Sequence, residues 1–168
     1  PTGLEFGRES TPSSHRIYKV IDLTKKHTRK FFDFKSDKKN AKDSMLVELR
    51  AHKHYTMCMG QYENGEKTVW NKADEITEIT YDALFKSVAL LALAATVLKK
   101  YAPDGTRNEY WKLLIATMWY AKFSQNDCMQ IVEAVTKVAK DDTNERLARV
   151  TDIYKRQTDE QLQGVPIL

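Results

Sequence analysis

The spacing of apolar residues changes near residue 73, and this change constrains the fold more than any other feature of the sequence. Before it, apolar residues form short runs rich in β-branched and aromatic side chains, which is typical of strands. After it, they recur with helical spacing. The predicted strands lie at residues 4–6, 16–23, 30–34 and 45–50. The predicted helices lie at residues 80–101, 108–122, 124–140 and 142–156. The sequence therefore predicts an α+β protein, with a β-rich domain over residues 1–72 and an all-α helix bundle over residues 73–168.

Turn signals separate these elements. Asn64-Gly65 lies between two further β-like runs, residues 54–59 and 67–70, and Asn-Gly favours a tight hairpin. Pro103-Asp104-Gly105 ends the first helix. Because the loops between the helices are short, neighbouring helices are expected to be antiparallel.

Composition indicates a reduced protein of the cell interior. The chain has 168 residues and two cysteines, Cys58 and Cys128, which form no Cys-x-x-Cys pattern. No signal peptide opens the sequence, and the longest apolar run, residues 88–98, is too short to span a bilayer. We therefore expect a cytoplasmic protein with no membrane partner, in which this run forms a buried helix.

Positive charge is concentrated in the first part of the chain. Residues 1–72 contain 15 lysines and arginines against 9 acids, and all four histidines; residues 73–168 contain 12 against 14. A basic domain is suited to a polyanion such as nucleic acid or a nucleoside triphosphate. A solvated basic surface without a partner explains the counts equally well.

The predicted strand at residues 45–50 carries an acid and a base among apolar residues. Side chains alternate between the faces of a strand, so Met45, Val47 and Leu49 are predicted to face the core. Glu48 and Arg50 then share the opposite face. They either pair with each other on a polar outer face or meet a ligand there.

A second polar motif, Ser13-Ser14-His15, precedes the predicted strand at residues 16–23. A hydroxyl and an imidazole two positions apart can both donate to a phosphate, and Arg8 and Arg16 add positive charge nearby. Taken alone, a Ser-x-His sequence is usually part of an ordinary loop.

In this order and spacing, these motifs resemble the primase-polymerases of the archaeo-eukaryotic primase superfamily found in plasmids and phages. Ser13-Ser14-His15 is similar to the second of that family's three core motifs, and the acid of Val47-Glu48-Leu49-Arg50 to the third. Asn64-Gly65-Glu66 before Trp70 is similar to the family's turn and closing tryptophan. Residues 105–108 and 141–154 resemble the helix-bundle domain that follows many such cores, so the resemblance covers nearly the whole chain.

The resemblance implies a DNA primase or DNA-directed polymerase that makes or extends primers on a single-stranded DNA template. It implies Mg²⁺ or Mn²⁺ as cofactor, nucleoside triphosphates as substrates, and Glu48 as the catalytic, metal-binding acid. Ser13, His15 and Glu48 are then expected to converge on one pocket. The residues expected to bind the nucleotide are Ser13, His15, Arg50, Arg8 and Arg16.

One motif of the family is missing. The first pair of acids should precede Ser-x-His, whereas Asp22 follows it. We interpret the chain as the C-terminal part of a catalytic core with its helix bundle, inactive alone, from the cytoplasm of a bacterial or phage-infected cell. A helicase domain or subunit of the same parent protein is a further expected partner.

The helical part is predicted to bind template. Arg107 and Asn108 open a helix, where free backbone N–H groups favour phosphate. The aromatic residues that follow are either core or a stacking surface for bases. These are Tyr110, Trp111, Trp119 and Tyr120. The alternative to an enzyme is a non-catalytic module that binds nucleic acid or nucleotide.

Overall fold

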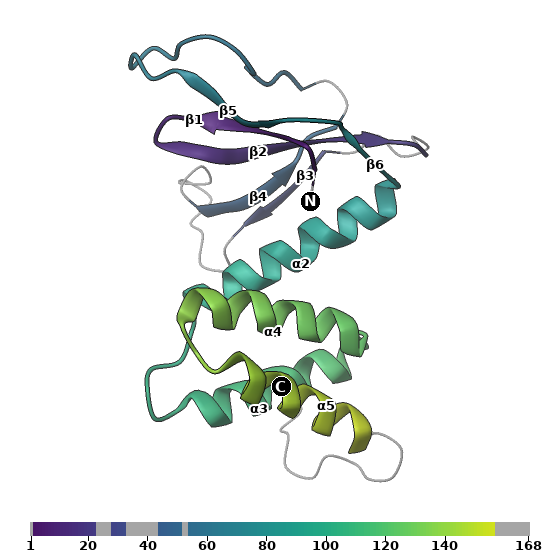
Figure 1. Cartoon of the computed structure of the whole chain (residues 1–168). Helices are drawn as coiled ribbons and strands as arrows, with labels where there is room; N and C mark the ends of the chain where they lie inside the picture. The colour runs from purple at the N-terminus through teal and green to yellow at the C-terminus, as the bar shows by residue number, and fades with distance from the viewer. Residues whose placement is uncertain (1, 23–27, 33–43, 52–53, 157–168) are drawn as a thin grey trace. The chain divides into compact units, whose positions relative to one another are not determined.

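The computed structural model describes residues 2–22, 28–32, 44–51 and 54–156 (Figure 1). Strands precede helices along the chain, which confirms the predicted α+β class. The chain divides into two compact units. The first unit comprises residues 1–30 and 48–88, and the second comprises residues 31–47 and 89–168. Each is described separately below.

A four-stranded sheet forms the centre of the first unit, in the order β5-β1-β2-β6. Strand β1 (Leu4–Arg8) pairs antiparallel with both β2 (Thr11–Val20) and β5 (Thr68–Ala73). Strand β6 (Thr77–Ile79) pairs in parallel with β2, which places residues beyond the expected boundary at 72 within the first unit.

The pairing of β1 with β2 is irregular between Phe6 and Arg8. Phe6 lies opposite His15, but Arg8 lies opposite Thr11, so β2 uses extra residues between these two pairs. Gly7 lies at this irregularity, and a Cβ there would lie 2.1 Å from the Thr11 carbonyl oxygen. The missing side chain of Gly7 thus makes room for the distorted segment of β2.

Strands β3 (Arg29–Phe32) and β4 (Met45–Leu49) form a separate two-stranded sheet. The predicted inward face of β4 is partly wrong, because Met45 is 37% exposed rather than part of a core. A two-stranded sheet buries each strand less than the interior position that the apolar run had indicated.

Four long helices follow the sheets: α2 (Tyr81–Lys99), α3 (Arg107–Tyr120), α4 (Gln125–Ala139) and α5 (Thr143–Lys155). All four agree closely with the helices predicted from the sequence.

Side-chain caps fix the starts of the last two helices. The Ser124 hydroxyl accepts from the Asp127 backbone N–H at 3.1 Å, and the Asp142 carboxylate accepts from that of Glu145 at 3.0 Å. These caps satisfy amides that a helix leaves unpaired in its first turn.

The core of the second unit lies among α3, α4, α5 and the C-terminal part of α2. Its largest fully buried side chain is Trp111. Around it pack Ala94, Val97, Ile115, Met118, Cys128, Ile131, Val132, Val135, Val150 and Ile153.

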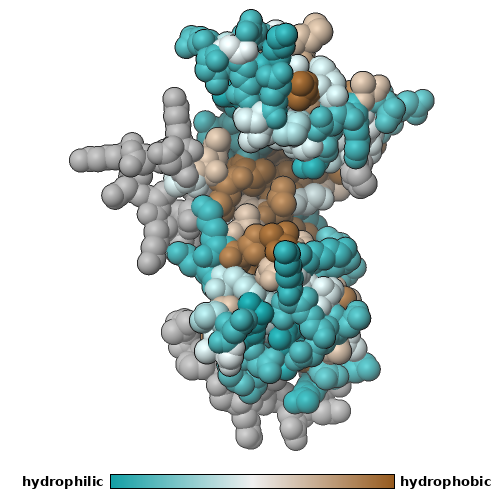
Figure 2. All heavy atoms as spheres, turned by 60° about the vertical axis from the view of Figure 1, so that its left-hand side comes forward, coloured by the Kyte–Doolittle hydropathy of each residue, from teal (hydrophilic) through white to brown (hydrophobic). Residues whose placement is uncertain are grey.

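Helix α2 differs from its sequence-based interpretation. Its 19 residues are long and apolar enough to cross a membrane by length and composition, although a core helix of a soluble protein can meet the same criteria. Only 28% of the most apolar 18-residue stretch of α2 is buried, and Leu91 is 52% exposed. The helix expected over this apolar run is confirmed, but it is only partly buried, contrary to the expectation of a buried helix. Figure 2 shows one face of the molecule, where hydrophobic residues form a limited patch on a largely hydrophilic surface.

Candidate functional site

His15 lies in a stack of aromatic rings on one face of the first unit's sheet. Its imidazole stacks on the Phe6 ring, with centroids 4.8 Å apart and planes 13° apart. The Phe6 ring, which is 1% exposed, also contacts Trp70 at 4.9 Å between centroids. The Trp70 indole N–H donates to the Cys58 carbonyl at 2.9 Å. These contacts hold the imidazole in a defined orientation.

Burial and two arginines keep His15 neutral near pH 7. Burial is the main cause of the lowered pKa of His15, and the charges of Arg50 and Arg8 lower the pKa further. The Ser14 hydroxyl lies 2.9 Å from the imidazole Nδ1. When Ser14 donates this hydrogen bond, the ring carries its proton on Nε2 and can donate it to an acceptor such as phosphate oxygen.

Arg8 lies on the same face as Phe6, two residues along β1. Its guanidinium is 3.9 Å from the centroid of the Tyr62 ring, which belongs to the hairpin before β5. That hairpin turns at Asn64-Gly65 as predicted: Gly65 has a φ of 86°, and the Tyr62 N–H donates to the Glu66 carbonyl at 2.8 Å. Arg8 is thus held in place by an aromatic face, which leaves its charge for other partners.

Glu48 and Arg50 pair with each other, as one of the two sequence-based interpretations proposed. The Arg50 Nε–H donates to a Glu48 carboxylate oxygen at 2.8 Å, and the Lys30 ammonium lies 3.5 Å from the other oxygen. Burial raises the pKa of Glu48, but the hydrogen bond from Arg50 and the charges of both cations outweigh it and leave the pKa below its usual value. Glu48 is therefore a carboxylate held between two cations.

The Glu48 carboxylate, which is expected to hold a metal ion, is paired with two cations in this structure. Both Glu48 oxygens are occupied by cations, and no group of three histidines, cysteines or acids with suitable geometry occurs in the described part of the chain. A divalent ion at Glu48 would have to displace Lys30 or Arg50 and draw further ligands from elsewhere. The role of Glu48 as a metal ligand stays a prediction.

Ser13 and Arg16 have their partners on the other face of the sheet. Glu5 precedes Phe6 in β1, so the two side chains point to opposite faces. Arg16 pairs with Glu5 at 2.9 Å, and a hydrogen bond from Ser13 is the main cause of the lowered pKa of Glu5. The Asn71 amide donates to the Ser13 hydroxyl at 2.7 Å. The irregularity in β2 thus separates Ser13 from His15, although a regular strand would place both on one face.

The structure therefore assembles only part of the predicted convergence. Arg50 joins His15 and Glu48, because its charge lowers the pKa of His15 and its Nε–H binds Glu48. The contribution of Lys30 to this cluster was not predicted. No local signal in the sequence could have revealed it, because it depends on the pairing of β3 with β4. We refer to Arg8, His15, Lys30, Glu48 and Arg50 as the histidine cluster.

The predicted template residues lie at the start of α3, in the second unit. Arg107 pairs with Asp104 at 2.6 Å, and its guanidinium is 5.4 Å from the centroid of the Tyr101 ring. Asn108 accepts a hydrogen bond from the Arg146 guanidinium, so its side-chain oxygen already has a partner. Of the two, Arg107 is the better placed to meet a phosphate.

Asp141 lies at the centre of a buried polar network close to this point. The Arg146 Nε–H and the Trp111 indole N–H each donate to its carboxylate at 3.0 Å, and the Tyr101 hydroxyl donates to it as well. Burial raises the pKa of Asp141, but the hydrogen bonds from Arg146, Tyr101 and Trp111 prevail and hold it far below its usual value. This network joins the end of α2 to the starts of α3 and α5.

Comparison of the chain with protein families, with curated proteins and with solved structures finds no match. The functional argument therefore rests on the geometry above and on the resemblance of the motifs.

Proposed function

We propose that the chain is part of a DNA primase-polymerase whose β-rich unit binds the triphosphate of a nucleotide at the histidine cluster. The observation that carries this proposal is the position of His15, stacked on Phe6, on the face of the sheet that also carries Arg8, with the charge of Arg50 nearby. Arg8 and Arg50 bring two positive charges toward the imidazole donor of His15, and this combination favours an anion as ligand. A triphosphate supplies that anion.

Each group of the cluster has a distinct task in this proposal. The neutral His15 donates its Nε2–H to one phosphate oxygen, in an orientation fixed by Phe6. Arg8 and Arg50 supply charge-assisted hydrogen bonds, which are shorter and stronger than neutral ones. Glu48 positions Arg50 through their 2.8 Å hydrogen bond.

Primer synthesis of this kind uses Mg²⁺ or Mn²⁺, and in the proposal Glu48 contributes to holding it together with acids outside the cluster. The second unit holds single-stranded DNA near Arg107. A helicase of the same parent protein and a cytoplasmic location are part of the same proposal.

The second candidate is a module that binds nucleotide or nucleic acid without catalysis. The ion pairs of Glu48 with both Lys30 and Arg50 favour it, because a carboxylate engaged in this way is not free to hold a metal.

Two assays on the full chain separate the candidates. Titration with a fluorescent ATP analogue should show binding, and His15→Ala should weaken it about tenfold, as expected for loss of a charge-assisted contact of about 1.5 kcal/mol. If neither His15→Ala nor Arg50→Ala weakens nucleotide binding, the site is rejected. A primer-extension assay with Mg²⁺ or Mn²⁺ then distinguishes the two candidates, since only the enzyme extends a template-bound primer.

A further inference from the structure

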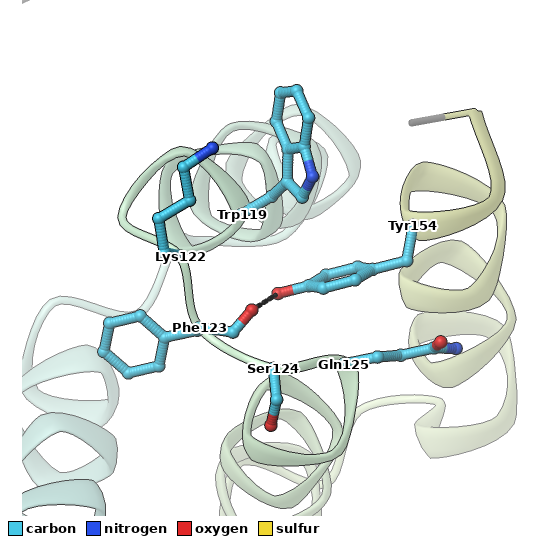
Figure 3. Close-up of a pocket in the computed structure, with 6 residues that line it drawn as sticks. All are labelled: Trp119, Lys122, Phe123, Ser124, Gln125 and Tyr154. Atoms are coloured by element: carbon cyan, nitrogen blue, oxygen red, sulfur yellow. Dashed lines mark hydrogen bonds between the residues drawn. The ribbon is translucent and has the colours of Figure 1, made fainter. Parts of the chain in front are cut away.

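A small open pocket lies where α3 turns into α4, next to the C-terminal end of α5. Its volume is about 310 Å³, at the lower end of the range for small-ligand sites. Three aromatic side chains, one lysine and two polar residues line it (Figure 3). They are Trp119, Lys122, Phe123, Ser124, Gln125 and Tyr154.

One aromatic wall of this pocket, Tyr154, is held in place by a hydrogen bond. The Tyr154 hydroxyl donates to the Phe123 carbonyl at 2.9 Å, which ties α5 to the α3–α4 turn (Figure 3). Burial raises the pKa of Tyr154 to about 12, so the hydroxyl keeps its proton for this hydrogen bond. A ligand therefore meets a wall that is already formed.

Positive charge lies directly beside the Trp119 ring. The Lys122 ammonium is 5.8 Å from the centroid of that ring, and Lys122 adopts the left-handed conformation, with a φ of 63°. In Figure 3, Trp119 and Lys122 lie on one side of the hydrogen bond between Tyr154 and Phe123, and Ser124 and Gln125 lie on the other. Lys155 and Arg156 follow Tyr154 in the chain and add positive charge at the end of α5.

Polar groups in the pocket remain available to a ligand. Within the part of the chain that the structure describes, the Gln125 amide and the Trp119 indole N–H have no hydrogen-bond partner. The nearby acid Asp127 is buried in the first turn of α4. The pocket thus combines an aromatic face, a cation and free donors.

We propose that this pocket binds one unpaired base of single-stranded nucleic acid, stacked on Trp119, with the adjoining phosphate at Lys122. Every base has a π-face, and an aromatic side chain next to a cation is the usual way to bind a single strand without sequence preference. The choice of nucleic acid as ligand rests on the proposed function, but the pocket shares no residue with the histidine cluster.

The test measures binding of the full chain to fluorescein-labelled oligo(dT) of twenty nucleotides by fluorescence anisotropy. Trp119→Ala should weaken binding about tenfold, because stacking of one base on an aromatic residue contributes on that order by alanine substitution. Leu113→Ala is the matched control, since Leu113 is an exposed apolar residue of the same helix, 49% exposed, outside the pocket. It should leave the affinity within twofold of the parent chain.

A charge variant tests the phosphate contact separately. Lys122→Asn should weaken binding about threefold and lower the slope of log Kd against log salt concentration by about one ion. Asparagine tolerates the left-handed conformation at this position, so the turn is preserved. Lys112→Asn, at an exposed lysine of α3, should change neither quantity.

The outcomes separate the possible ligands. The chain has three tryptophans, so the signal of Trp119 is the part of the fluorescence that is lost in Trp119→Ala. Quenching of this part by oligo(dT) but not by AMP at millimolar concentration supports a site for a strand; equal quenching by AMP overturns it in favour of a free nucleotide. If Trp119→Ala changes neither the affinity nor the melting temperature, the proposal is overturned and the aromatic residues are part of the packing. If His15→Ala still weakens ATP binding in that case, the histidine cluster survives and only this pocket is rejected.

Discussion

Glu48 in the first unit and Asp141 in the second unit each lie between polar partners, but the two arrangements differ in how far their cations are exposed. In the second unit, Asp141 and Arg146 are both buried, with side chains 7% and 6% exposed. In the first unit, the Glu48 side chain is 8% exposed, whereas its partners Lys30 and Arg50 are 49% and 39% exposed. The acids are alike, but only in the first unit do the cations meet solvent.

This difference separates a structural network from the binding site that we propose. The groups around Asp141 satisfy one another, so the network fixes three helix ends and leaves little for a ligand. The Arg50 guanidinium is exposed and lies near enough to His15 for its charge to lower the pKa of His15, and we expect it to contact an incoming anion. The predictions below test this contrast, from the largest expected effect to the smallest.

Removal of Arg146 should produce the largest loss of stability. Arg146→Ala leaves the Asp141 carboxylate buried without its cation, which costs about 3–5 kcal/mol. Denaturant unfolding measured by helical circular dichroism should show this loss. Glu133→Ala is the control, because it breaks the exposed pair with Lys137 on α4 and should cost under about 0.5 kcal/mol. Equal losses in the two variants would show that the buried network has no special role.

Acid should weaken the second unit through Asp141. Its pKa is lowered in the folded state, so its contribution to stability is complete above about pH 4, the ordinary pKa of aspartate. That contribution is lost as the pH falls toward the lower folded pKa, because the unfolded chain takes up the proton first. Melting temperatures recorded from pH 6 to pH 2 should fall less steeply for Asp141→Asn than for the parent chain. Parallel curves would contradict the lowered pKa.

Loss of Arg107 should weaken DNA binding without unfolding the chain. If Arg107 contacts a phosphate, Arg107→Ala costs about 1–3 kcal/mol of affinity and reduces the salt dependence by about one ion. Anisotropy with labelled single strands at several salt concentrations gives both values. A lowered melting temperature with an unchanged salt slope would instead assign Arg107 to its pair with Asp104.

The smallest effect is on the titration of His15. Arg50→Ala removes one of the charges that lower its pKa, so the pKa should rise toward its ordinary value of about 6.5. Proton NMR of the imidazole from pH 4 to pH 8 measures this directly. Arg16→Ala should leave the titration unchanged, because Arg16 pairs with Glu5 on the other face of the sheet. A larger shift in the pKa of His15 in Arg16→Ala than in Arg50→Ala would contradict the assignment of Arg16 and His15 to opposite faces of the sheet.

Local signals in the sequence predicted the local features of the structure. Helical spacing located all four helices, and Ser124 and Asp142 cap two of them in the structure. Asn64-Gly65 located the hairpin. Each of these depends on residues a few positions apart, where propensity and turn chemistry act directly.

Features that depend on pairing between strands far apart in the sequence were not predicted, or were predicted wrongly. Strand β6 was not predicted, because its parallel pairing with β2 joins residues far apart in the chain. The resemblance predicted that Ser13 and His15 converge on one pocket, but the irregular pairing of β2 with β1 separates them. The pair of Lys30 with Glu48 has the same origin. The residue types of the candidate site could be read from the sequence. Which of these residues lie together depends on the pairing of the strands, which the sequence did not predict.

Nucleotide titration of matched variants tests the histidine cluster most directly. His15→Ala and Arg16→Ala change neighbouring residues of β2 whose side chains have partners on opposite faces of the sheet. With a fluorescent ATP analogue and the full chain, His15→Ala should weaken binding about tenfold, while Arg16→Ala should change it less than twofold. Equal weakening in both variants, or weakening by Arg16→Ala alone, would contradict a triphosphate site on the face of the sheet that carries Phe6 and His15.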